Sequence, residues 1–151
     1  MEIIIIIIMG LVADRLTKWW ALKDLANGKS IEIIPNFFSF SYLENRGAAF
    51  GIFQNMLIIL VIITACVLIG LVYYLIKYKP KSKLLRVSFA MIICGAIGNL
   101  IDRVNYNFVV DFILVHYKQH NFPTFNVADI FVVVGTMLLA LCIIKEEEEW
   151  N

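Results

Sequence analysis

Four aspartates stand out in this 151-residue sequence because each lies within or beside an apolar stretch: Asp14, Asp102, Asp111 and Asp129. An ionisable side chain at membrane depth is costly unless it is paired or hydrated, so it is a candidate functional residue by default. Two carboxyl groups that share a site cannot easily both ionise, and such a pair can supply one general acid and one general base. It therefore matters which of the four have a cation nearby.

Sequence spacing places cations near two of these acids. Asp14 and Lys18 are spaced i,i+4, close enough to pair on one helix face. Asn99, Asp102 and Arg103, at i, i+3 and i+4, likewise share a face. We expect Asp14, Lys18 and Asp102 to form structural ion pairs that hold helices together.

Asp111 and Asp129 have no evident cationic neighbour in the sequence. Asp111 lies between Val110 and Phe112, and such apolar flanks should raise the pKa of a carboxyl group. For Asp129 the residues themselves favour a helix cap, with Asn126 as the N-cap and Asp129 as the acid three positions later. A functional carboxylate is the alternative.

The remaining metal-binding residue types give little support for a metal or cofactor. His116 and His120 are four apart and would share a ligand only if that stretch were helical. Cys66, Cys94 and Cys142 lie in apolar runs without a CxxC pair, so we interpret them as core residues. We expect no metal and no cofactor.

The elements that must position these acids are membrane helices. The chain is 61% hydrophobic and only 17% charged, whereas soluble domains are about 45–50% apolar and about 25% charged. Crossing the hydrocarbon layer takes about 20 helical residues. The apolar stretches predict an all-α membrane protein with one domain over residues 1–151 and four transmembrane helices at about 3–22, 56–76, 84–103 and 126–144.

Charge sets the expected orientation of these helices. The linker between the second and third helix carries Lys77, Lys79, Lys81, Lys83 and Arg86, and such a cluster is typical of a cytoplasmic loop. Both termini are then cytoplasmic, and all four aspartates lie toward the outer boundary. The net charge of +1 gives no basic surface for nucleic acid.

The first outer loop, at about 23–55, carries a strand pattern. Polar and aromatic residues alternate from Phe38 to Tyr42, after the apolar run from Ile31 to Ile34. We expect short strands with one apolar face. This face would contact lipid, an acylated substrate or the helix bundle, and the residues do not distinguish these.

The sequence resembles the bacterial lipoprotein signal peptidases, also called signal peptidase II. Five blocks carry the resemblance, in the same order as in that family: Asp14-Arg15-Leu16-Thr17-Lys18; Asn45-Arg46-Gly47-Ala48-Ala49-Phe50-Gly51; Gly95-Ala96-Ile97-Gly98-Asn99-Leu100-Ile101-Asp102-Arg103; Val109-Val110-Asp111-Phe112; and Phe125-Asn126-Val127-Ala128-Asp129. There are small departures, because many members have a further acid where this chain has Leu114 and Gly-Gly where it has Cys94-Gly95.

The resemblance implies a membrane aspartyl endopeptidase that cleaves diacylglyceryl-modified prolipoproteins before the lipidated cysteine. Asp111 and Asp129 match the catalytic dyad of the family. Asp14, Lys18 and Asp102 match positions that hold its helices in place. The positions matching residues that bind substrate or support the site are Asn45, Arg46, Gly47, Asn99, Arg103 and Asn126.

The resemblance also implies surroundings and partners. A strand cradle is expected at roughly 30–51 and an outer-loop helix at roughly 106–122. We expect a monomer in the bacterial inner membrane, with its active site toward the extracytoplasmic side and prolipoprotein and lipid as partners. The alternatives are a small transporter with an intramembrane proton site and a non-catalytic relative that acts as a membrane chaperone or lipid-binding partner.

Overall fold

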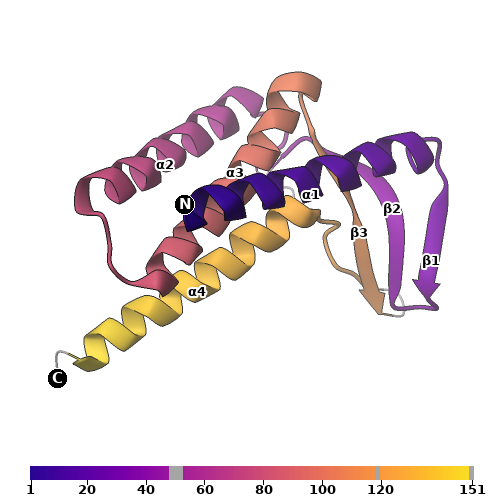
Figure 1. Ribbon diagram of the computed structural model, residues 1–151. Helices are drawn as coiled ribbons and strands as arrows, with labels where there is room; N and C mark the ends of the chain where they lie inside the picture. Colours follow the sequence, from indigo (N-terminus) through magenta and orange to yellow (C-terminus); the bar gives the residue numbers. More distant parts are fainter. Residues whose placement is uncertain (48–52, 118–119, 150–151) are drawn as a thin grey trace.

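A computed structural model describes residues 1–47, 53–117 and 120–149. In Figure 1 the helices lie together, and the strands gather on one side of them, along the C-terminal half of the first helix. The elements, in chain order, are α1 (Glu2–Asp24), β1 (Ser30–Ile34), β2 (Phe38–Asn45), α2 (Leu57–Tyr78), α3 (Lys83–Tyr106), β3 (Val109–Tyr117), β4 (His120–Asn121) and α4 (Val127–Glu149).

The helices lie where the apolar stretches predict them, with ends that differ by a few residues. Within the described chain, three helical stretches are long and apolar enough to cross a membrane: Leu57–Tyr78, Lys83–Tyr106 and Val127–Lys145. α1 is also 23 residues long, but it carries Asp14, Arg15 and Lys18 in its C-terminal half. The chain is therefore a multi-pass membrane protein.

α3 is the central helix of the bundle and contacts α1, α2 and α4. Its buried residues run from Leu85 to Asp102, whereas the only buried residue of α2 is Leu60. A Cβ atom added at Gly95 of α3 would collide with the carbonyl oxygen of Ala128 in α4. Glycine at this position thus allows α3 and α4 to approach closely.

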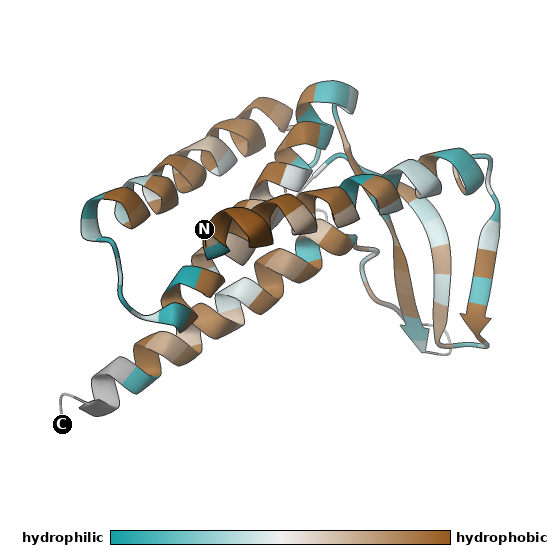
Figure 2. Cartoon of the chain, viewed as in Figure 1, coloured by the Kyte–Doolittle hydropathy of each residue, from teal (hydrophilic) through white to brown (hydrophobic). Residues whose placement is uncertain are grey.

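Apolar side chains cover the outside of the bundle as well as its inside. Figure 2 shows hydrophobic colour along most of α2 and polar colour in the linker that follows it. Ile58, Ile69 and Ile76 of α2 are 66–75% exposed, as expected for a surface that faces lipid. Cys94 and Cys142 are buried, but Cys66 is exposed on α2, so its interpretation as a core residue is wrong.

The strands form one antiparallel sheet in the order β1-β2-β3-β4. β2 pairs with β3 so that Asn45 lies opposite Val109 and Leu43 opposite Asp111. Ala21 and Leu25 at the end of α1 pack with Val110 and Phe112 of β3 in one buried cluster. The predicted strands in the first outer loop are confirmed, and the apolar face of the sheet packs against α1.

The outer-loop helix expected at 106–122 is wrong for the residues that the structure describes there. Val109–Tyr117 form strand β3, and α3 ends at Tyr106. The reason is physical: the segment is rich in Val, Ile and Phe, which favour strands, and β2 offers it a partner edge. Residues 48–51 of the expected strand cradle lie outside the described residues.

Candidate active site

The first turn of α4 positions Asp129 through a reciprocal cap. The backbone N–H of Asp129 donates to Oδ1 of Asn126 at 3.0 Å, and the backbone N–H of Asn126 donates to Oδ2 of Asp129 at 3.1 Å. This is the capping-box arrangement, which satisfies N–H groups that a helix start otherwise leaves unpaired. The other oxygen of Asp129, Oδ1, accepts a hydrogen bond from Nδ2 of Asn99 at 2.7 Å.

Asp111 belongs to strand β3 and also contacts Asn126. Its side chain is fully buried, and its two oxygens accept from Nδ2 of Asn45 at 2.9 Å and from Nδ2 of Asn126 at 2.6 Å. Burial, followed by the nearby charge of Asp129, raises the pKa of Asp111 to about 7, against the opposing effect of the two amide donors. Near neutral pH this carboxyl group therefore exists in both protonation states.

Asn126 joins the two carboxyl groups. Its Nδ2 donates to Asp111 and also to Oδ1 of Asn99 at 3.2 Å, while its Oδ1 and backbone N–H bond to Asp129. A strand and a helix start thus bring two acids, 18 positions apart in the chain, around one buried asparagine.

A cavity of about 1130 Å³ opens beside Asp129. Its polar wall includes Asn45, Arg46, Asn99 and Arg103. Asp111 is fully buried and does not line the cavity, but it accepts a hydrogen bond from Asn45, which does. Most of the remaining wall is apolar and comes from β3, α4 and the segment between them, including Leu114, Val115, Phe122, Phe125, Ile130 and Val133.

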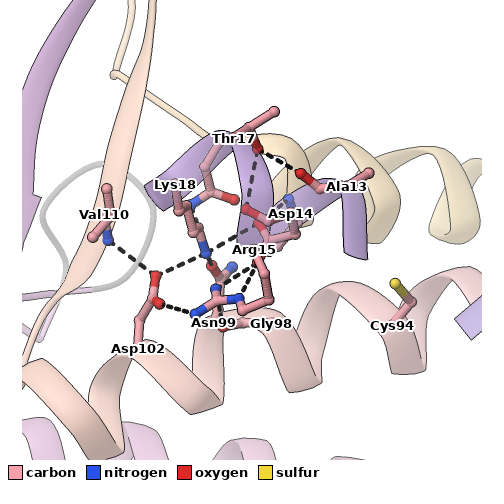
Figure 3. A network of polar contacts seen from close by, with 12 residues as sticks. Ala13, Asp14, Arg15, Thr17, Lys18, Cys94, Gly98, Asn99, Asp102 and Val110 are labelled. Carbon is pink, nitrogen blue, oxygen red and sulfur yellow. Dashed lines mark hydrogen bonds and ion pairs between the residues drawn. The ribbon is translucent and has the colours of Figure 1, made fainter. Parts of the chain in front are cut away.

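A buried ion cluster lies next to this site, between α1 and α3 (Figure 3). Nζ of Lys18 lies 3.2 Å from Asp14 and 2.8 Å from Asp102. Arg15 bonds to the same two acids at 2.5 and 2.6 Å. Asp102 thus pairs with cations of α1, a helix away, and not with the neighbouring Arg103.

Arg103 instead secures the segment that follows β2. Its Nη2 donates to the carbonyl oxygen of Gly47 at 3.2 Å, and the N–H of Gly47 donates to Oδ1 of Asn45 at 3.0 Å. The Asn45 amide is thereby oriented with its Nδ2 toward Asp111. Arg46 is exposed and pairs with Glu44 at 2.8 Å.

The structure offers no evident metal centre in its described part. No group of three or more His, Cys, Asp or Glu side chains is placed there to hold an ion. His116 and His120 belong to the paired strands β3 and β4, so the helical spacing that would give them a common ligand is wrong.

Comparison with known proteins identifies the family. The family described as signal peptidase (SPase) II matches residues 6–145. The chain belongs to the signal peptidase II family. It is 57% identical to the lipoprotein signal peptidase of Clostridium novyi, with 95% of this chain and 97% of that protein covered, and 53% identical to that of Clostridium tetani, with 95% and 93% covered.

A solved structure supports the same assignment. A bacterial membrane enzyme determined by the in meso method superposes with a TM-score of 0.91 and 33% identity, covering 99% of this chain and 92% of that one. Membership in the signal peptidase II family makes this chain a peptidase, and it removes the transporter alternative.

Signal peptidase II motifs account for most of the residues that meet here, but not for every contact. The structure brings together Asn45, Asn99, Asp111, Asn126 and Asp129. Arg15 was not predicted to have a role, although it contacts both acids of the ion cluster. A role for Arg15 could have been predicted from the sequence, because a cation adjacent to Asp14 in an apolar helix needs a buried partner.

Proposed function

We propose that this peptidase removes signal peptides from diacylglyceryl-modified prolipoproteins, cutting before the lipidated cysteine, with Asp111 and Asp129 as its catalytic dyad. The observation that carries the proposal is that Asn126 bonds to both carboxyl groups, to Asp111 through its side-chain Nδ2 and to Asp129 through its backbone N–H, beside a largely apolar cavity that Asp129 lines. The names of the relatives supply the substrate class.

In the proposed reaction Asp129 is the base. It lies at the helix start, where the macrodipole and the Asn126 N–H favour negative charge, and it lines the cavity from which water arrives. Asp129 takes a proton from water as the water oxygen attacks the scissile carbonyl carbon. Because water is the nucleophile, no covalent intermediate forms.

Asp111 is the acid in this scheme. Its raised pKa keeps a proton available near neutral pH. The substrate carbonyl replaces the Asn45 amide at Asp111 and receives that proton as the tetrahedral intermediate forms. When the C–N bond breaks, the new hydroxyl returns a proton to Asp111, and Asp129 delivers its own proton to the leaving amine.

The supporting residues have separate proposed tasks. Asn99 and Asn126 orient the dyad through the hydrogen bonds described above. Arg103 and Gly47 orient Asn45 toward Asp111 before substrate binds, and Arg46 contacts substrate at the cavity wall. The apolar side of the cavity receives part of the diacylglyceryl group, so the lipid contributes to selectivity.

The proposed setting is the bacterial inner membrane. α1 is the fourth span, its charges being neutralised by the ion cluster with Asp102. Both termini are cytoplasmic, and the sheet and active site face the extracytoplasmic side, where lipid surrounds a monomeric, single-domain enzyme that does not bind nucleic acid.

Cleavage of a defined substrate tests this proposal. The purified wild type should convert a diacylglyceryl-modified prolipoprotein to a product that begins with the modified cysteine, identified by mass spectrometry. Asp111→Asn and Asp129→Asn should each lower the rate by on the order of a thousandfold. Asp24→Asn, at the end of α1, is the matched control and should retain activity.

The same assay should show weak cleavage of an otherwise identical peptide that lacks the lipid. Full activity of either dyad variant would refute the assignment of the dyad. Cleavage at another bond, or equal rates with and without lipid, would refute the proposed specificity.

A further inference from the structure

Lys18 contacts both the ion cluster and the site. Its side chain is only 2% exposed, and its Nζ lies within hydrogen-bonding distance of Asp14, Asp102 and Oδ1 of Asn99, the last at 3.0 Å. Figure 3 shows Lys18 between these groups, where α1 meets α3. A buried ammonium group needs acceptors for all three of its protons, and here it has them.

The contact with Lys18 favours one orientation of the Asn99 amide, the same one that Nδ2 of Asn126 favours by donating to Oδ1 of Asn99 at 3.2 Å. An ammonium group can only donate hydrogen bonds, so it requires the oxygen of the amide. With Oδ1 held toward Lys18, Nδ2 of Asn99 must face the other way, and there it donates to Oδ1 of Asp129 at 2.7 Å. A flipped Asn99 would set an N–H against Lys18 and an oxygen against the carboxylate of Asp129.

Arg15 provides a natural comparison within the same cluster. It donates to Asp14, Asp102 and the carbonyl oxygen of Gly98. These bonds tie α1 to α3 as those of Lys18 do, but they do not involve the side chain of Asn99. Two cations thus share the acids of one cluster, and the contact with Asn99 distinguishes them.

We propose that Lys18 is a positioning residue for the dyad, which fixes the Asn99 amide so that it donates to Asp129. This inference rests on the proposed function and deepens it. The charged groups near Asp129 are Asp14 and Lys18 of α1, Arg103 of α3 and Asp111 of β3. Among these, Lys18 is the cation that reaches the carboxyl group of Asp129 through a hydrogen-bonded amide.

The test compares Lys18→Met with Arg15→Met, since each variant removes one cation from the same cluster. Both should lower the thermal stability of the enzyme. Per folded molecule, Lys18→Met should lower kcat on the order of tenfold or more with little change in KM. Arg15→Met should retain kcat within about twofold, because the Asn99 amide keeps its orientation. The substrate is the diacylglyceryl-modified prolipoprotein.

A second variant separates positioning from folding. Lys18→Met with Asp102→Asn restores the charge balance of the cluster, so it should recover part of the lost stability without recovering kcat. Equal kcat losses in Lys18→Met and Arg15→Met, or recovery of kcat in the double variant, would overturn the inference. The wild type and Asp129→Asn are assayed in parallel. If the proposed function is wrong, these two proteins will show equal activity.

Discussion

The two oxygens of Asp129 have different partners. Oδ2 caps the start of α4 by accepting the N–H of Asn126, and Oδ1 accepts the Asn99 amide. The cap was predictable from an asparagine followed three positions later by an acid, because capping depends on residues close in the chain. The neighbourhood of Asp111 was not, because it depends on the long-range pairing of β2 with β3. Only the order of the motifs pointed to a dyad.

Stability should depend on pH through Asp111. Its pKa is about 7 in the folded protein and 3.8 ordinarily. As pH rises between these values, the unfolded chain releases a proton that the folded chain keeps, so folding becomes less favourable. The Asp111→Asn variant has no such group. Between pH 5 and pH 8, the free energy of unfolding of this variant should rise by roughly 2–3 kcal/mol relative to that of the wild type.

Thermal unfolding in detergent at the two pH values measures this difference. The comparison cancels groups that titrate alike in both proteins. A gap between variant and wild type that is the same at both pH values would mean that Asp111 is not held protonated in the fold.

At the scale of elements, one stripe of α3 serves both packing and chemistry. Gly95, Gly98, Asn99 and Asp102 follow the spacing of one helix face. The glycines allow α4 and Asp14 to approach closely, and the polar residues contact Asp129 and Lys18. The lack of a side chain at Gly95 therefore determines how closely α4, which carries Asp129, can approach Asn99.

Gly95→Ala should accordingly weaken the contact between α3 and α4. The added methyl group meets the backbone carbonyl of Ala128, which cannot rotate away, so the cost should be about 1–3 kcal/mol. Activity should fall too, because Asp129 moves with α4. Gly70→Ala in α2 is the matched control, since nothing lies within 4 Å of its added atom.

For Gly70→Ala, better helix propensity predicts a gain of up to about 1 kcal/mol. Chemical denaturation of both variants in detergent, with the cleavage assay beside it, measures these effects. If Gly95→Ala were as stable as Gly70→Ala, the close packing of α3 against α4 would not be important for the fold.

The elements were predicted correctly where residues close in the sequence determine the structure. The predictions failed where a contact with a residue distant in the sequence determines it. Apolar length located α1, α2, α3 and α4, and alternation located β1 and β2. The helix expected at 106–122 came from the family resemblance, whereas the Val-rich residues of β3 themselves favour a strand. Likewise, spacing within α3 grouped Asp102 with Arg103, while the actual partners of Asp102 belong to α1.

At the scale of the whole molecule, chemistry is concentrated at one end. The sheet lies toward the C-terminal end of α1, and the lysine-rich linker between α2 and α3 lies at the other end of the bundle (Figures 1 and 2). The proposed dyad belongs to β3 and the start of α4, and the cations of the ion cluster belong to the C-terminal half of α1. Because such a linker is retained in the cytoplasm, the proposed orientation follows from the separation of these two ends.

Cysteine labelling tests that orientation. In a background with Cys66→Ser, a cysteine introduced by Asn27→Cys, between α1 and β1, should react with a membrane-impermeant maleimide added outside intact cells. One introduced by Lys81→Cys should react only after the membrane is opened. Labelling in the reverse order would mean that the protein is inserted the other way round.

The contributions to the site are spread along almost the whole chain. Lys18 comes from its beginning, Asn45 and Asn99 from its middle, and Asn126 and Asp129 from the start of the last helix. A nascent chain that has not yet been translated past Asn126 contains Asp111 but not the second acid. The proposed dyad is thus complete only after Asp129 has been translated, and we expect hydrolytic capacity to appear only as α4 enters the bilayer.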